Sequence, residues 1–238
     1  MLALRLFPLA AALLLAIAGN ATPPITLTSP DGNIRVTVQP TDSFPVYSIK
    51  YKDVPVVEAA PLDLVFKEPG VTTGASFFGP GLLIHAATRE GTDNYTLPVG
   101  RNSQVNDHYN ESAITLEQPR SHRRLTLLVR AYNEGIAFRW VFPKQPGWTQ
   151  YELLAENTNI RLAGDPYLQA SYLPGYTSSH EGRYTRLPFH EVKNETLMDM
   201  PVFLEFPTKA CKDHYIWPSP KRSSRTTPEC TSSNTTAC

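Results

Sequence analysis

The sequence predicts an all-β protein, most simply a β-sandwich. Short segments alternate apolar and polar residues, turn residues separate them at close intervals, and no long segment after residue 21 shows a helical stripe. The 22 prolines are spread along the chain and disfavour long helices. An apolar content of 41% suffices for a core, and a charged content of 18% is too low for a disordered chain.

The expected strands follow a period of two in side-chain character. In segment 34–39, Ile34, Val36 and Val38 alternate with polar residues. Because Pro55 lacks a backbone N–H, segment 54–57 is expected at a sheet edge or at the start of a strand. Further strands are expected at residues 46–51, 62–66, 113–117, 151–154, 159–162 and 202–206.

The clearest hairpin covers residues 125–142. Two strands flank Asn133-Glu134-Gly135, which we expect to be a three-residue loop whose glycine takes the left-handed conformation. Alternate residues of the second arm are expected to share one face: Ile136, Phe138, Trp140 and Phe142.

Residues 1–21 are interpreted as a secretory signal peptide. Arg5 supplies the positive charge, and the apolar run Leu6–Ala18 is too short for a membrane span. A buried or amphipathic first helix is the alternative, but no polar face interrupts the run. We therefore expect an exported protein, periplasmic or secreted, with no membrane attachment after signal cleavage.

Composition and motifs exclude several function classes. Lys plus Arg and Asp plus Glu both number 22, so no net charge favours a nucleic-acid partner. No nucleophile elbow, zinc-protease motif, phosphate loop or paired-cysteine zinc site occurs, and no catalytic residue is predicted. All three cysteines lie at or after Cys211, so no disulfide framework holds the main body.

Two clusters of polar and aromatic residues, 106–111 and 180–184, are candidate binding sites. Their Tyr, Asn, Glu and His side chains suit sugar hydroxyls or a hard cation. The alternative for each cluster is a polar loop whose hydrogen bonds are satisfied internally.

From Thr28–Gly32 onward the chain resembles the N-terminal domain of glycoside hydrolase family 97. The stretches that carry the resemblance follow the family's order over about residues 26–207: Val46–Tyr51, Pro55–Val57, His108–Glu111, Arg130–Trp140 and Phe142-Pro143. The resemblance implies a β-supersandwich similar to galactose mutarotase, here incomplete at its C-terminal end. It also implies an exported bacterial α-glucosidase or α-galactosidase. In that family this domain packs on a (β/α)8 barrel that carries the catalytic carboxylates and acts on an α-linked oligosaccharide.

The resemblance also implies Ca²⁺ at the active site, with one glutamate ligand from the N-terminal domain. The family's Pro-Gly, Glu and Tyr-Thr pattern places that ligand at Glu181, between Pro174-Gly175 and Tyr184-Thr185. Since Ca²⁺ takes 6–8 oxygen ligands, the others would come from the barrel. The barrel needs roughly 250 residues, whereas this sequence stops at residue 238. We therefore expect residues 22–209 to be a truncated, non-catalytic domain that is inactive alone.

Residues 210–238 are expected to be a disordered, non-native tail. They show no strand periodicity and hold all three cysteines. A shifted reading frame permits a family-like continuation, in which the single codon of Trp217 before Pro218 forces an alanine. We interpret the tail as out-of-frame translation that begins near Lys209–Lys212, with a native tail as the alternative.

Two other function classes stay open. A stand-alone carbohydrate-binding or interaction module would have a closed sandwich with a polar finish. A mutarotase-like epimerase rests on fold analogy alone, and the sequence contains no evident His/Glu pair for it.

Overall fold

The computed structural model describes residues 23–98, 103–207, 212–217 and 234–237. Within these residues the chain is nearly all β, and its one helical element is the short 3₁₀ turn Phe189–Glu191. The helices of the described part include none that is long and apolar enough to span a membrane. The predicted signal peptide, residues 1–21, lies outside the described residues.

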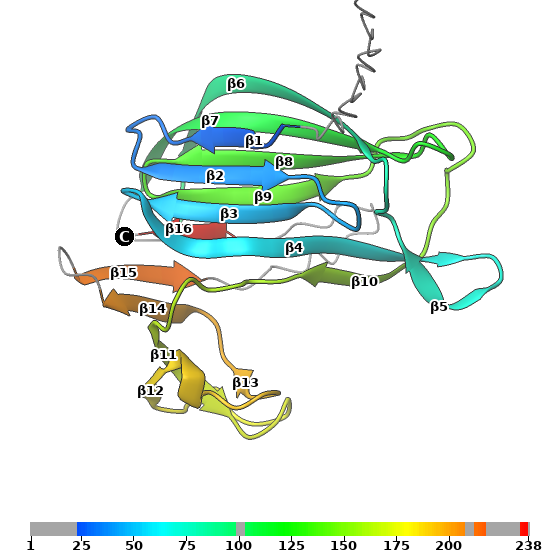
Figure 1. Ribbon diagram of the computed structural model, residues 1–238. Coiled ribbons are helices and arrows are strands. Elements are labelled where there is room, and N and C mark those ends of the chain that lie inside the picture. The colour runs from blue at the N-terminus through cyan, green and yellow to red at the C-terminus, as the bar shows by residue number, and fades with distance from the viewer. Residues whose placement is uncertain (1–22, 99–102, 208–211, 218–233, 238) are drawn as a thin grey trace, which may run out of the picture.

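The first sheet has six antiparallel strands in the order β1-β2-β3-β4-β10, with β5 paired to β4. Figure 1 shows β1–β4 as the front layer of the molecule. The bounds of these strands are β1 Ile25–Thr28, β2 Ile34–Gln39, β3 Val46–Tyr51, β4 Val54–Glu68, β5 Val71–Ser76 and β10 Leu153–Thr158.

The second sheet has ten antiparallel strands in the order β12-β11-β14-β15-β16-β9-β8-β7-β6, with β13 paired to β11. Strands β6–β9 form the rear layer, and β11–β14 form a lobe below the two layers (Figure 1). The bounds are β6 Leu83–Thr96, β7 Gln104–Glu117, β8 Arg124–Tyr132, β9 Gly135–Val141, β11 Tyr167–Leu173, β12 Tyr184–Pro188, β13 Leu197–Met198, β14 Val202–Pro207, β15 Lys212–Trp217 and β16 Asn234–Ala237.

The core lies between the inner faces of the two layers. The alternating apolar residues of β2, among them Val36, are buried, as are Leu64 of β4 and Leu127 of β8. Trp140 of β9 is 1% exposed, and its ring centre lies 5.7 Å from that of Phe78. Burial of one face from each sheet is the defining property of a sandwich, so the predicted fold class is confirmed.

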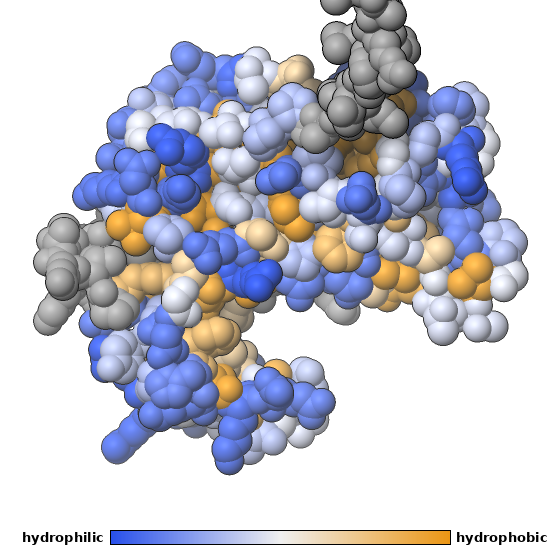
Figure 2. Space-filling view, viewed as in Figure 1, coloured by the Kyte–Doolittle hydropathy of each residue, from blue (hydrophilic) through white to orange (hydrophobic). Residues whose placement is uncertain are grey.

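Figure 2 shows apolar side chains along the hollow between the lobe and the lower edge of the two layers. The lobe joins the rest of the second sheet through β15 and β16, which pair with β14 and β9. The expectation of a tail without strands is therefore wrong for 212–217 and 234–237. A strand needs only ladder partners for its backbone, so weak side-chain alternation does not exclude it. The remaining tail residues lie outside the described part.

The expected hairpin exists as β8 and β9, but its turn differs. Gly135 is the first residue of β9 and pairs with Thr236 of β16, and its φ is not positive. The left-handed glycine was therefore a wrong expectation, because this residue belongs to a strand ladder. The shared face of Ile136, Phe138 and Trp140 is buried as expected.

For two pairs of expected strands, the structure has one strand with different bounds. Segments 54–57 and 62–66 are one strand, β4, which is interrupted at Ala59 by a positive φ of 43° and a shift in the register with β3. Such a bulge adds a residue and changes which face the next side chain takes. Pro55 lies at the start of β4, as expected.

The expected strands 151–154 and 159–162 are wrong in their bounds. The strand is β10, at Leu153–Thr158, and Leu162 makes only an isolated bridge to Val57. Because β10 is an edge strand with polar residues in its second half, alternation does not reveal its position.

Candidate functional site

The structure places Glu181 in the loop between β11 and β12, within the lobe below the sandwich. Its side chain is exposed. The carboxylate makes no hydrogen bond or ion pair with any described residue, so both of its oxygens are available to a ligand.

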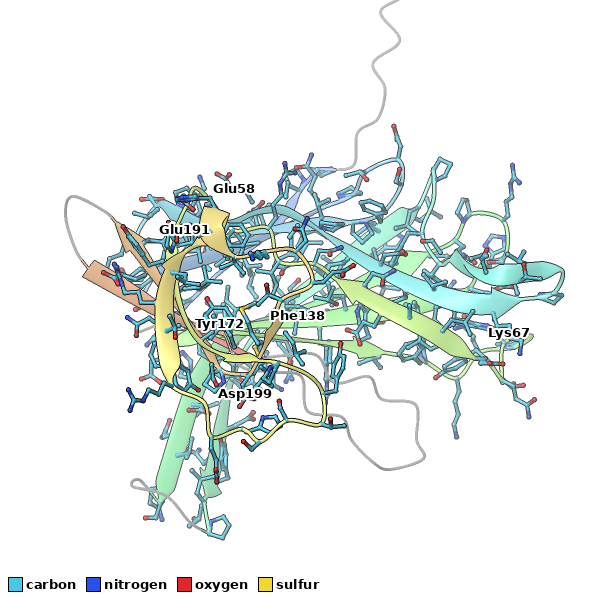
Figure 3. All side chains as sticks on the ribbon, turned by 90° about the horizontal axis from the view of Figure 1, so that it is seen from below. Glu58, Lys67, Phe138, Tyr172, Glu191 and Asp199 are labelled. Atoms are coloured by element: carbon cyan, nitrogen blue, oxygen red, sulfur yellow. The ribbon has the colours of Figure 1, made fainter. Side chains whose placement is uncertain are left out.

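The residue before Glu181 anchors one side of this loop. His180 Nδ1 lies 2.9 Å from Asp199 Oδ2, and the hydrogen bond from His180 holds the pKa of the Asp199 carboxyl below its ordinary value. The backbone N–H of Asp199 in turn donates to the carbonyl oxygen of Ser171 in β11 at 2.8 Å. In Figure 3, Asp199 lies beside Tyr172, the next residue of β11.

The residue after Glu181 anchors the other side. Gly182 lies so close to Ser171 that a Cβ at this position would be 2.7 Å from Ser171 Oγ. Real Cβ atoms essentially never come this close to a side chain, so only glycine fits without a shift. His180 is thus joined to β11 through Asp199, and Gly182 packs directly on Ser171 of β11.

One carboxylate does not make a metal site. In the part of the chain that the structure describes, no group of three or more His, Cys, Asp and Glu side chains could hold a metal ion. Ca²⁺ needs 6–8 oxygen ligands, so Glu181 fits such an ion only as one ligand of a site completed from elsewhere. His180 is engaged by Asp199 and adds no oxygen.

The other predicted cluster, 106–111, lies on β7 and not in a polar loop. Its Glu111 is almost fully buried and accepts hydrogen bonds from Arg89 Nε and Arg130 Nε, each at 2.6 Å. Burial acts to raise the pKa of the Glu111 carboxyl, but these two guanidinium groups outweigh it, and the pKa is lowered.

The same network continues along the β6–β7 hairpin. Arg130 Nη1 also donates to Asp93 Oδ2 at 2.6 Å, and its guanidinium carbon lies 4.0 Å from the centre of the Tyr109 ring. Glu111, Arg130 and Asp93 thus satisfy one another, whereas the buried Asn110 Oδ1 has no partner among the described residues. The charged part of the cluster therefore stabilises the hairpin and is not free for a ligand.

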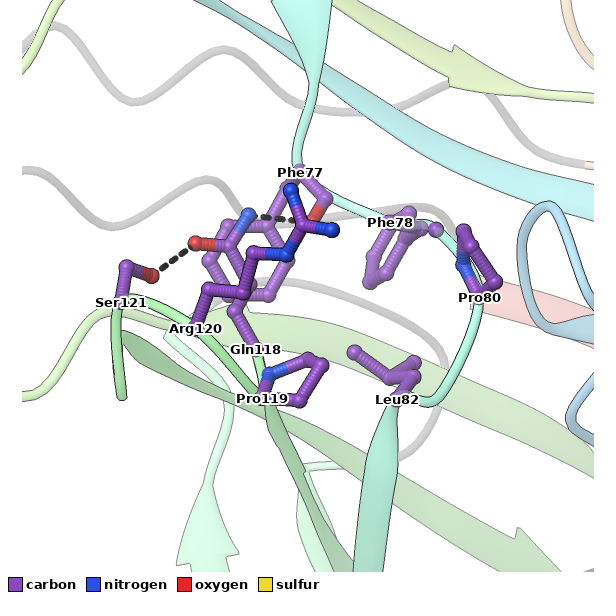
Figure 4. Close-up of a pocket in the computed structure, with 9 residues that line it drawn as sticks. Phe77, Phe78, Pro80, Leu82, Gln118, Pro119, Arg120 and Ser121 are labelled. Atoms are coloured by element: carbon purple, nitrogen blue, oxygen red, sulfur yellow. Dashed lines mark hydrogen bonds between the residues drawn. The ribbon is translucent and has the colours of Figure 1, made fainter.

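A shallow pocket opens at the end of the sandwich between segments 77–82 and 118–121 (Figure 4). The Gln118 amide, which could contact a ligand, is already engaged: it donates to the Phe77 carbonyl at 2.6 Å and accepts from Ser121 Oγ. The walls are mainly apolar, with Phe78 and Leu82, and the exposed Arg120 lies at the rim. Nothing in the sequence pointed to this pocket, because its two segments lie far apart in the chain.

Comparison with known proteins identifies the family. Residues 27–214 match the family model described as Glycosyl-hydrolase 97 N-terminal. The chain belongs to this family. A retaining alpha-galactosidase from Bacteroides thetaiotaomicron is 25% identical over 190 residues, which are 76% of this chain and 26% of that protein.

Solved structures share the fold of this glycoside hydrolase family 97 domain. Those of a family 97 enzyme from Pseudoalteromonas sp. strain K8, including complexes with panose and with acarbose, are 22% identical with a TM-score of 0.67. The match covers 90% of this chain and 34% of the chain of the enzyme. A beta-arabinopyranosidase is 17% identical, with a TM-score of 0.68 and 35% of its chain covered. The chain thus spans about a quarter to a third of the length of these relatives.

The sequence pointed to Glu181 through the polar cluster 180–184 and, as a calcium ligand, through the family resemblance, but it missed both anchors of this loop. Asp199 lies beyond β12 and reaches His180 because β13 pairs with β11. The glycine in Glu181-Gly182 was visible in the sequence, but its contact with Ser171 depends on the path of the loop.

Proposed function

We propose that this chain is the non-catalytic N-terminal β-sandwich of an exported bacterial α-glycosidase of the family 97 type. In this proposal it packs on a (β/α)8 barrel and supplies Glu181 as one calcium ligand. The observation that carries the proposal is the family match over residues 27–214, joined to a fold shared with much longer glycosidases. The panose and acarbose complexes of those enzymes support an α-linked oligosaccharide as the substrate of the whole enzyme.

The chemistry of Glu181 is compatible with that role. Carboxylate oxygens are preferred Ca²⁺ ligands, and this carboxylate is exposed on an anchored loop. A bound calcium ion would orient and polarise substrate oxygens. In this role Glu181 is the ligand that the sandwich domain contributes to the ion, and the other ligands come from the catalytic domain.

A chimera tests the proposal directly. Residues 22–209 would replace the matching segment of the Bacteroides thetaiotaomicron α-galactosidase, and activity on nitrophenyl α-galactoside would be titrated with Ca²⁺. We expect Glu181→Gln to raise the Ca²⁺ concentration for half-maximal activity by about tenfold, which corresponds to about 1.4 kcal/mol. Glu134→Gln, which changes an exposed glutamate of the β8–β9 turn, should leave it unchanged.

Two results would contradict the proposal. The 238-residue chain alone should not hydrolyse nitrophenyl α-glucoside or α-galactoside above a vector control, so turnover by this chain would refute the non-catalytic assignment. Submillimolar Ca²⁺ binding by the chain alone, lost in Glu181→Ala, would show that the site is complete without a barrel. It would favour the stand-alone module.

A further inference from the structure

We infer that the loop between β11 and β12 contacts the oligosaccharide itself, with Tyr176 as an aromatic platform for one pyranose ring. This inference rests on the proposed function and assigns a sugar contact to the sandwich domain beyond the single calcium ligand. Among the exposed large apolar side chains of the described residues, Tyr176 (90%) and Tyr184 (53%) are the most exposed. Both belong to this loop and its junction with β12, and they flank Glu181 in the sequence.

The backbone at Tyr176 is fixed. Residues 175–178 form a β-turn in which the Ser178 N–H donates to the Gly175 carbonyl at 3.2 Å. The Ser178 hydroxyl donates to the same carbonyl at 2.6 Å. Tyr176 is the second residue of this turn. Its ring therefore projects from a turn that is closed by two hydrogen bonds from Ser178. A ring that is held in this way loses little backbone freedom when it binds a ligand.

Two polar residues that follow Tyr176 in the same loop match the rest of a sugar. Glu181 presents two acceptor oxygens, and the exposed Arg183 presents a fork of donors. Neither side chain makes a hydrogen bond or ion pair with a described residue. A carboxylate and a guanidinium two residues apart in one loop can accept from and donate to the hydroxyls of a neutral ligand without leaving a net charge.

The combination selects one ligand chemistry. A pyranose has an apolar face of C–H groups, which covers an aromatic ring, and a rim of hydroxyls, which need hydrogen-bond partners. A single exposed tyrosine on a protein surface needs no explanation. Here, however, the two most exposed rings lie on either side of an unpaired carboxylate and an unpaired guanidinium, within nine residues of one anchored loop. An α-linked oligosaccharide satisfies all four groups.

The test uses the 238-residue chain and panose as the probe, observed by saturation-transfer NMR. We expect saturation of the panose ring protons and a dissociation constant of roughly millimolar order. Tyr176→Ala should weaken binding by about fivefold or more, because the stacking contact is lost. Tyr176→Phe keeps the ring and should retain binding within about twofold.

The matched control is Tyr95→Ala, which removes a ring that is 48% exposed on the remote β6–β7 hairpin and should leave binding unchanged. Because Tyr176 is almost fully exposed, its removal should not alter the urea unfolding midpoint, which checks the fold. The inference is overturned if the wild type gives no panose saturation, or if Tyr176→Ala and Tyr95→Ala bind equally. A failed inference leaves the calcium titration of the chimera intact, so the two proposals are tested separately.

Discussion

Ser171 combines deep burial with an unsatisfied hydroxyl. It is 1% exposed, and its Oγ has no hydrogen-bond partner among the described residues. A buried hydroxyl without a partner has lost its hydration for no gain. We therefore expect Ser171→Ala to be neutral or stabilising by up to about 1 kcal/mol in urea unfolding. A loss of stability would mean that the hydroxyl has a partner after all, such as a bound water.

The same hydroxyl explains the glycine next to Glu181. Gly182→Ala would place a Cβ 2.7 Å from Ser171 Oγ but 4.0 Å from Ser171 Cβ. Alone this change should cost about 1–3 kcal/mol through overpacking, whereas in the Ser171→Ala background the cost should largely disappear. Unfolding of the two single variants and the double variant measures the coupling. Strictly additive effects would show that the loop does not rest on this contact.

Glu111 should make the stability of the protein depend on pH. Its folded-state pKa is lowered from 4.5, despite burial, by the hydrogen bonds from Arg89 and Arg130. A carboxyl with a lowered folded pKa stabilises the protein above its unfolded pKa, and this contribution is lost as the pH falls through the folded value. We expect Glu111→Gln to cost about 2 kcal/mol at pH 7 and clearly less at pH 3. Glu134→Gln is the exposed control, and an equal cost at both pH values for Glu111→Gln would contradict the charge network.

At the scale of the strands, Gly91 in β6 makes room for the Tyr109 ring of β7. The two residues are register partners, and a Cβ on Gly91 would lie 2.6 Å from that ring. The ring also packs under Arg130, so Gly91→Ala should displace it and loosen the hairpin by about 2 kcal/mol.

Hydrogen exchange locates the effect of this change. Amides of β6 and β7 should lose more protection than those of β2 and β3. Thr88→Ala, an exposed residue on the opposite face of the same strand, is the control and should change little. Equal loss in the strands of both sheets would mean that the hairpin does not unfold as its own unit.

Side-chain alternation predicted the strands that have one buried and one exposed face. This holds for β2 and β9, which carry Val36 and Trp140. It failed for β6, because both faces of that strand are largely exposed, and for β11, where Ala170 and Ser171 are adjacent and both buried. The sequence therefore revealed most of the sandwich body but, in the lobe that carries Glu181, only β14. The anchors of the loop depend on pairings between distant strands, which local patterns do not encode.

At the scale of the whole molecule, β6 is the exposed edge of the ten-stranded sheet. It has 14 residues and pairs on one side only, with β7. A long edge strand presents unpaired N–H and C=O groups that can add a strand from another copy. We expect the 238-residue chain to associate with rising concentration, as measured by light scattering.

Charge placed on this edge should oppose that association. Thr88 and Thr92 are exposed on β6, and lysines on an edge strand repel a second copy because burying their charges is costly. Thr88→Lys with Thr92→Lys should shift the onset of association to about tenfold higher concentration, equivalent to about 1.4 kcal/mol. The control is the same pair of changes at Thr26 and Thr37, which face each other on β1 and β2 of the other sheet. If the wild type stays monomeric at all concentrations, or if both lysine pairs act alike, then the β6 edge does not drive association.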